Sequence, residues 1–245
     1  MHHVSRRPRI FAMAVATVGA MATVAASLVS TAQAAPTRTA TVTFLHAIPA
    51  GSGIGTVDLY SGARPLAQNL AAGDLRTLQL PAGAYDLRIV ADGRGSAPDT
   101  TLLRAPRARI VADKNITVAA HLNAAGKPTL TQYTNDTRTV GMGMGRLTVR
   151  NIAAGSPLDL RLGSTTMQDG LGNPQQTDLG LLAGNYRLDI RAEGTSRRVM
   201  APVPVTITNR PGRSDMGTNS IVYIWGSTAD RALQTTTQNV RIDLQ

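Results

Sequence analysis

The chain has 245 residues, a formal net charge of +10 and no cysteine, and only 3% of its residues are aromatic. The absence of cysteine excludes disulfides and a lipid-modified cysteine, so the fold must depend on strand pairing and an aliphatic core. All basic residues except Lys114 and Lys127 are arginine, a skew that a GC-rich genome produces without selection for binding. Aromatic platforms for stacking nucleobases are scarce, which argues against specific nucleic-acid recognition.

The first 34 residues are predicted to be a signal peptide. Arg6, Arg7 and Arg9 precede an apolar run at 10–29, and an A-x-A site ends at Ala34. Cleavage after Ala34 removes 34 of the 245 residues and leaves 211, with a net charge of +7. We therefore expect a secreted or surface-associated protein. The alternatives are an uncleaved membrane anchor, which the length of the run permits, and twin-arginine export, against which Pro8 and Arg9 argue.

From Pro36 onward, short runs of alternating apolar and polar residues recur between turn residues, which predicts strands throughout. In the first half the predicted strands are 41–46, 56–60, 75–80, 85–91, 101–110, 115–122 and 129–133. In the second half they are 146–151, 157–162, 177–182, 186–192, 198–208, 220–226 and 232–237.

The two halves repeat one pattern. LPAGAYDLRIV at 80–90 and LLAGNYRLDIR at 181–191 are 101 residues apart, as are VDLY at 57–60 and LDLR at 158–161. We predict an amino-terminal tail at 35–40, one domain at 41–135, a short linker at 136–145 and a second domain at 146–245. The glycines of the linker predict a flexible hinge. The alternative is that Met142 and Met144 pack between the domains.

Tyr85 and Tyr186 occupy the same place in the repeated segment, two residues after a glycine that permits a tight turn. This arrangement resembles the tyrosine corner of Greek-key sandwiches, in which the phenol bonds the backbone of the connection. We therefore predict a structural role for both tyrosines.

Three segments together resemble a known family: VTFLHAIPAG from Val42, the stretch from Val57 to Gly93, and ITVAAHLNAAG from Ile116. They are similar to domain of unknown function 4397, found in secreted and surface bacterial proteins and often in tandem. The resemblance covers 42–134 and, more loosely, 147–238. It implies two tandem immunoglobulin-like or transthyretin-like Greek-key β-sandwich domains and no established activity. The second copy departs at 150–152, where Arg-Asn-Ile replaces Leu-His-Ala, and at Leu182 in place of Pro81.

Candidate reactive residues are isolated, so no catalytic, metal or cofactor site is predicted. His46 is expected to bond the following turn, where the second copy has Asn151, and His121 is expected to face solvent. Asp58 and Asp159 occupy equivalent outward positions and are expected to pair with arginine on a neighbouring strand. Loop carboxylates that offer a weaker calcium hypothesis are Asp92, Asp99 and Asp113.

The charged feature that is most suggestive of function is a basic edge on each copy. It comprises Arg94, Arg104, Arg107 and Arg109 in the first copy and Arg197, Arg198, Arg210 and Arg213 in the second. These edges can hold a polyanion; alternatively, they prevent sheets from pairing between molecules.

These patterns predict a non-catalytic secreted or surface-associated protein with a structural or adhesive role, whose two modules raise avidity for a repeating partner. A basic module that binds cell-wall polymer or acidic glycan is the alternative, and a hydrolase with a site assembled from loops is a third hypothesis. The expected partner is a wall polymer, an acidic glycan or another surface protein. The mature chain is expected to lack a membrane span, and the pattern leaves its oligomeric state open.

Overall fold

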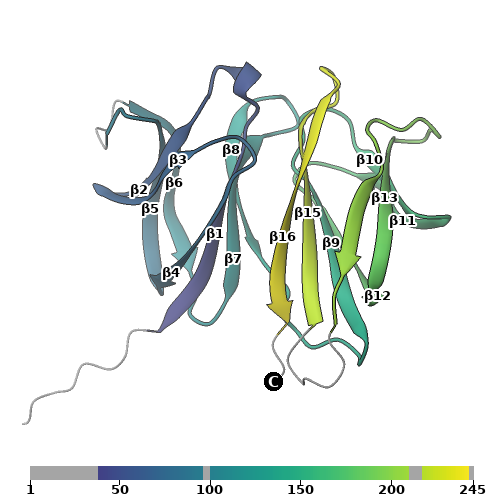
Figure 1. Cartoon of the computed structure of the whole chain (residues 1–245). Coiled ribbons are helices and arrows are strands. Elements are labelled where there is room, and N and C mark those ends of the chain that lie inside the picture. Colours follow the sequence, from purple (N-terminus) through teal and green to yellow (C-terminus); the bar gives the residue numbers. More distant parts are fainter. Residues whose placement is uncertain (1–37, 96–99, 210–216, 243–245) are drawn as a thin grey trace, which may run out of the picture. The chain divides into compact units, whose positions relative to one another are not determined.

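β-strands form nearly all the regular structure of both halves of the chain (Figure 1). The computed structural model describes residues 38–95, 100–209 and 217–242. The predicted signal peptide and its cleavage site, Asp99, Arg210 and Arg213 lie outside the described residues. Within the described residues, no helix is long and apolar enough to cross a membrane.

The first copy is a sandwich of two four-stranded sheets, ordered β4-β1-β7-β8 and β3-β2-β5-β6. In the first sheet, β1 runs antiparallel to β4 and parallel to β7. A one-turn 3-10 helix, η1, spans Ala50–Ser52. The strands are β1 (Thr39–Ala47), β2 (Val57–Ser61), β3 (Arg64–Leu70), β4 (Leu75–Pro81), β5 (Gly83–Ala91), β6 (Thr101–Ile110), β7 (Asn115–Leu122) and β8 (Pro128–Thr134).

The second copy repeats this topology, with sheets ordered β12-β9-β15-β16 and β11-β10-β13-β14. Its β9 is again antiparallel to one neighbour, β12, and parallel to the other, β15. The strands are β9 (Met144–Asn151), β10 (Leu158–Leu162), β11 (Thr165–Leu171), β12 (Gln176–Leu182), β13 (Gly184–Ala192), β14 (Val203–Ile207), β15 (Gly217–Ser227) and β16 (Ala232–Ile242). The predicted tandem β-sandwich fold is confirmed.

The main differences from the predicted strands concern four strands of the structure. The segments of β3 and β11 were not expected to be strands, because Pro65 in the first and polar residues in the second obscure the alternation. The strand predicted at 198–208 is only Val203–Ile207, since Pro202 removes a backbone donor directly before it. The last strand continues to Ile242, five residues beyond its predicted end.

Each sandwich buries its own aliphatic core between its two sheets. Val42 and Leu59 belong to the core of the first copy, and Val149 and Leu160 to that of the second. Removing such side chains from water contributes roughly 1.5–3 kcal/mol each. The two cores explain the alternating pattern, because every strand of a sandwich turns one face inward.

A third apolar cluster joins the two copies. It contains Leu45, Ala119 and Tyr133 from the first copy and Tyr223 and Trp225 from the second. These residues lie on the faces of the β1 and β9 sheets that point away from the sandwich cores. Residues 37–245 accordingly form one compact unit.

The centre of this interface is a buried arginine. Arg150 is 1% exposed, and its guanidinium carbon lies 4.2 Å from the centre of the Tyr133 ring and 5.4 Å from that of Tyr223. It donates to the Tyr223 hydroxyl (2.8 Å) and to Gln176 Oε1 (2.9 Å). No carboxylate among the described residues is recorded in an ion pair with it, so ring faces and neutral acceptors accommodate the charge. Burial lowers the pKa of this guanidinium.

Hydrogen bonds between the copies surround the arginine. Gln238 of β16 donates to Thr43 Oγ1 and accepts from Thr117 Oγ1, both at 3.0 Å. Tyr133 donates to the Pro174 carbonyl (2.8 Å). These bonds exist only while the copies are in contact, so separating the copies requires water to replace each of them.

The connection between the copies begins in ordered contacts. The Asp136 carbonyl accepts from Asn219 Nδ2 at 3.1 Å, and its carboxylate pairs with Arg138 and Arg146. Met142 is 97% exposed, so the alternative prediction that it packs between the domains is wrong. The flexible hinge at 136–145 stays a prediction.

Candidate functional site

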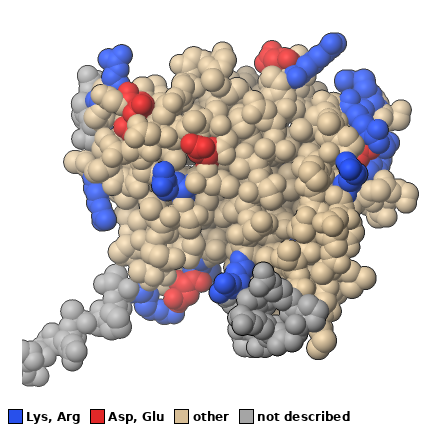
Figure 2. All heavy atoms as spheres, viewed as in Figure 1, with Lys and Arg blue, Asp and Glu red and all other residues tan. Residues whose placement is uncertain are grey.

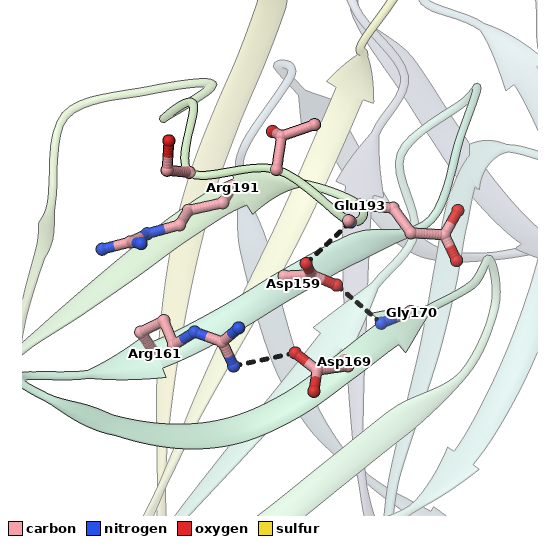
Figure 3. A pocket seen from close by; sticks show the side chains of 9 residues that line it. Asp159, Arg161, Asp169, Gly170, Arg191 and Glu193 are labelled. Carbon is pink, nitrogen blue, oxygen red and sulfur yellow. Dashed lines mark hydrogen bonds and ion pairs between the residues drawn. The ribbon is translucent and has the colours of Figure 1, made fainter.

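An open polar cleft lies on the outer sheet of the second copy, where β10, β11 and the turn after β13 meet (Figure 3). Its volume is about 650 Å³, within the range of small-ligand sites. Every side chain that lines it is polar or charged apart from two glycines: Asp159, Arg161, Asp169, Gly170, Arg191, Glu193, Gly194, Thr195 and Ser196.

Asp159 forms the floor of the cleft and is only 3% exposed. Its Oδ1 accepts from the amide of Gly170 and its Oδ2 from the amide of Gly194, both at 2.9 Å. The first bond lies at a register irregularity between β10 and β11, where Gly170 adopts a φ of +64°. Asp159 therefore fixes a β-bulge and a turn, two elements that carry side chains into the cleft.

Two arginines, each about three-quarters buried, form one wall. Arg161 Nη1 lies 2.7 Å from Asp169 Oδ1, and the two side chains are 23% and 65% exposed. Arg191 is 26% exposed and donates twice to Asp189 Oδ2. A guanidinium has five N–H donors, so the recorded bonds leave donors of both residues available to a ligand.

Asp189, two residues before Arg191 on the same face of β13, orients the Arg191 side chain of this wall. Hydrogen bonds from Arg198 and Arg191 hold the pKa of its carboxyl below the usual range. The carboxylate thus stays ionised and anchors two arginines. Figure 3 shows the Arg161 and Arg191 guanidinium groups on one side of Asp159 and the Glu193 carboxylate on the other.

The predicted pairing of Asp58 and Asp159 with arginine is wrong. Asp58 is 2% exposed, and its Oδ1 accepts from the Asn69 amide at 2.9 Å, at the bulge equivalent to that of Gly170. Both carboxylates bond backbone amides because the bulge leaves an amide without a partner in the ladder. Their equivalent placement in the two copies reflects this structural need.

His46 bonds the following turn, as predicted. Its Nε2 lies 2.9 Å from the Gly55 carbonyl, and its Nδ1 is buried without a hydrogen-bond partner. The space beside the ring is an apolar void of about 10 Å³, too small for a substrate. Burial lowers the pKa of this imidazole.

The prediction that His121 faces solvent is wrong. Its side chain is fully buried between the copies, with Nδ1 2.8 Å from the Leu122 carbonyl and Nε2 2.8 Å from Thr131 Oγ1. Burial lowers the pKa of this ring too. The outward face of β7 meets the second copy rather than water, so the alternation pattern assigned it to the wrong environment.

The two repeated tyrosines bond their own connections. The Tyr85 hydroxyl donates to the Pro81 carbonyl at 2.8 Å, and the Tyr186 hydroxyl donates to the Leu182 carbonyl at 2.9 Å. Each bond spans four residues across the turn that the repeated motif encodes. This is the geometry of a tyrosine corner.

The described members of the predicted basic edges are all exposed. Arg104, Arg107 and Arg109 lie on β6. Arg94 follows β5, and Arg197 and Arg198 lie between β13 and β14. Arg104 makes a bidentate pair with Asp86 (2.8 and 2.7 Å), and Arg198 donates to Asp189 (2.8 Å). Among the described residues, no ion pair is recorded for four others: Arg94, Arg107, Arg109 and Arg197. Figure 2 shows basic side chains gathered on the side where β11 and β13 lie.

Among the described residues, no cluster of ligands supports the calcium hypothesis. Asp113 pairs with Arg38, and within the described part of the chain no three acidic, histidine or cysteine side chains gather as metal ligands. Asp92 belongs to an exposed turn and bonds the Thr56 carbonyl through its amide (3.1 Å).

Sequence reasoning overlooked the lining of the cleft. Arg161, Asp169 and Arg191 are spaced too far apart to form a local motif. The signal that would have found them is a comparison between copies: the equivalent positions in the first copy hold Tyr60, Gln68 and Val90.

The fold and these contacts define a tandem β-sandwich protein whose two copies form one unit. Residues 40–161 match the family described as Domain of unknown function (DUF4397). This part of the chain, which covers the first copy and the start of the second, belongs to that family. Among curated proteins, none matches the sequence.

Proposed function

We propose that the protein is a non-catalytic, secreted or surface-associated β-sandwich protein with a structural or adhesive role. The observation that carries the proposal is the buried interface, which fixes two copies as one body and leaves both outer sheets exposed. Such a body presents two faces to a repeating partner with a constant separation, which favours simultaneous engagement.

Four side chains that could act in catalysis are buried or bonded to the backbone, which also supports a role without catalysis. His46 and His121 are buried with lowered pKa values, and Asp58 and Asp159 hold backbone amides. A general acid or base must reach the proton that it transfers. These four side chains instead stabilise turns, bulges and the interface.

A basic module that binds wall polymer or acidic glycan is a second candidate function. The exposure of Arg94, Arg107 and Arg197, together with the cleft arginines, favours it. Attraction between such arginines and a polyanion is screened by salt, because the Debye length falls from about 30 Å at 0.01 M to about 3 Å at 1 M.

Co-sedimentation with purified bacterial cell wall separates the two candidates. If the basic surfaces hold the protein, we expect retention at low ionic strength and release at about 1 M salt. Retention that is unchanged by salt contradicts the basic-module function and supports adhesion by neutral contacts. Absence of retention at both ionic strengths, together with absence of binding to intact cells, contradicts both candidates.

A further inference from the structure

The cleft of the second copy has side chains that the fold itself does not require. The first copy builds the same sheet and the same bulge, with Asp58 bonded to Asn69 as Asp159 is to Gly170. Yet its equivalents of Arg161 and Arg191 are Tyr60 and Val90, both buried. The shared scaffold is therefore structural, whereas the arginine pair is particular to the second copy. Glu193, by contrast, has an acidic counterpart in Asp92 of the first copy.

We propose that this cleft binds an acidic saccharide, that is, a sugar unit that carries a carboxylate. The inference rests on the glycan-binding candidate above and names the place and the chemistry of recognition. The cleft has room for one or two such units, given its volume of about 650 Å³.

The arginine wall supplies the contact to the carboxylate. Arg161 and Arg191 come from adjacent strands, β10 and β13, and are each about three-quarters buried. Their pairing with Asp169 and Asp189 holds the side chains in place, so little rotamer entropy is lost when a ligand binds. Guanidinium groups bond carboxylates through parallel N–H donors, and such charge-assisted bonds are stronger than neutral ones.

The rest of the cleft lining suits sugar hydroxyls. Asp159 lies between the guanidinium groups and the Glu193 carboxylate (Figure 3). The Thr195 and Ser196 side chains complete the lining. A carboxylate accepts from hydroxyl donors, and a hydroxyl side chain both donates and accepts. The nine lining residues include no aromatic side chain, which disfavours a nucleobase or another flat apolar group.

Retention of the purified protein on immobilised polygalacturonate, with neutral dextran as the reference matrix, tests the proposal. Arg161→Gln is expected to weaken binding about tenfold, because it removes a charge-assisted contact. The matched control is Arg107→Gln, an equal change of charge on the exposed edge of the first copy, which is expected to alter binding less than about twofold. Thermal unfolding of each variant verifies that the fold is intact.

Glu193→Ala distinguishes recognition of a saccharide from simple attraction between charges. If Glu193 accepts a sugar hydroxyl, its removal weakens retention; if only net charge matters, its removal strengthens retention and overturns the proposal. Equal weakening by Arg161→Gln and Arg107→Gln also overturns the proposal that the cleft is the binding site. It leaves the hypothesis that the basic edges bind a polyanion intact. If the wild type is retained no better on polygalacturonate than on dextran, the proposed saccharide site in the cleft is wrong. Co-sedimentation with cell wall then still tests whether the protein binds wall polymer at all.

Discussion

Trp225→Ala is expected to lower the free energy of unfolding by about 3–5 kcal/mol, the cost typical of truncating a buried tryptophan. Trp225 is 2% exposed and packs in the cluster between the copies, with its indole N–H 3.1 Å from Thr236 Oγ1. Its ring leaves little space beside Gly73 of the first copy: a Cβ at that glycine would lie 3.3 Å from Cζ2. The truncation therefore removes contacts from both copies.

Urea unfolding followed by far-ultraviolet circular dichroism measures this effect. Leu182→Ala is the control, because that side chain is 65% exposed and its truncation is expected to change stability by no more than about 0.5 kcal/mol. A Trp225→Ala midpoint equal to that of the control would show that the tryptophan does not hold the copies together.

Arg150→Ala is expected to lower the free energy of unfolding by about 2–4 kcal/mol. It leaves a cavity between two tyrosine rings and removes the hydrogen bond that Arg150 donates to the Tyr223 hydroxyl. Arg150→Met keeps most of the volume and abolishes the buried charge, whose desolvation is unfavourable. Tyr223 still donates to Gln238 Oε1 at 2.7 Å. We therefore expect Arg150→Met to lie within about 1.5 kcal/mol of the wild type.

The ranking of these variants reveals what the arginine contributes. If the Met and Ala variants are equally unstable, the cation–π contacts rather than the filled volume dominate. Arg187→Ala, on an exposed position of β13, is the control and is expected to change stability by no more than about 0.5 kcal/mol. Wild-type stability of Arg150→Ala would contradict the buried position described for this side chain.

Alternation along the chain predicted most strands and the tandem fold, because each strand of a sandwich has one face in an aliphatic core. It failed where both faces are buried. His121 was assigned to solvent for that reason, although the unbroken apolar run from Ile221 to Trp225 is the pattern of a strand covered on both sides. The interface also hides polar residues such as Arg150, which alternation counts as exposed.

The candidate site was less accessible to sequence reasoning. The basic edges were visible as clusters in the sequence, and the tyrosine corners as a repeated motif. The cleft is assembled by pairing β10 with both β11 and β13, which brings Arg161 near residues 30 positions further along the chain. Such pairing follows from sheet topology, which a local pattern does not encode.

The central claim is that the two copies form one unit through a buried interface, and Trp225 offers its most direct test. It is the only tryptophan in the chain, so intrinsic fluorescence reports on the interface while far-ultraviolet circular dichroism reports on all the strands. In urea, we predict that the two signals follow one coincident transition. A fluorescence change that precedes the loss of strands would show that the copies separate while still folded, and would contradict the claim.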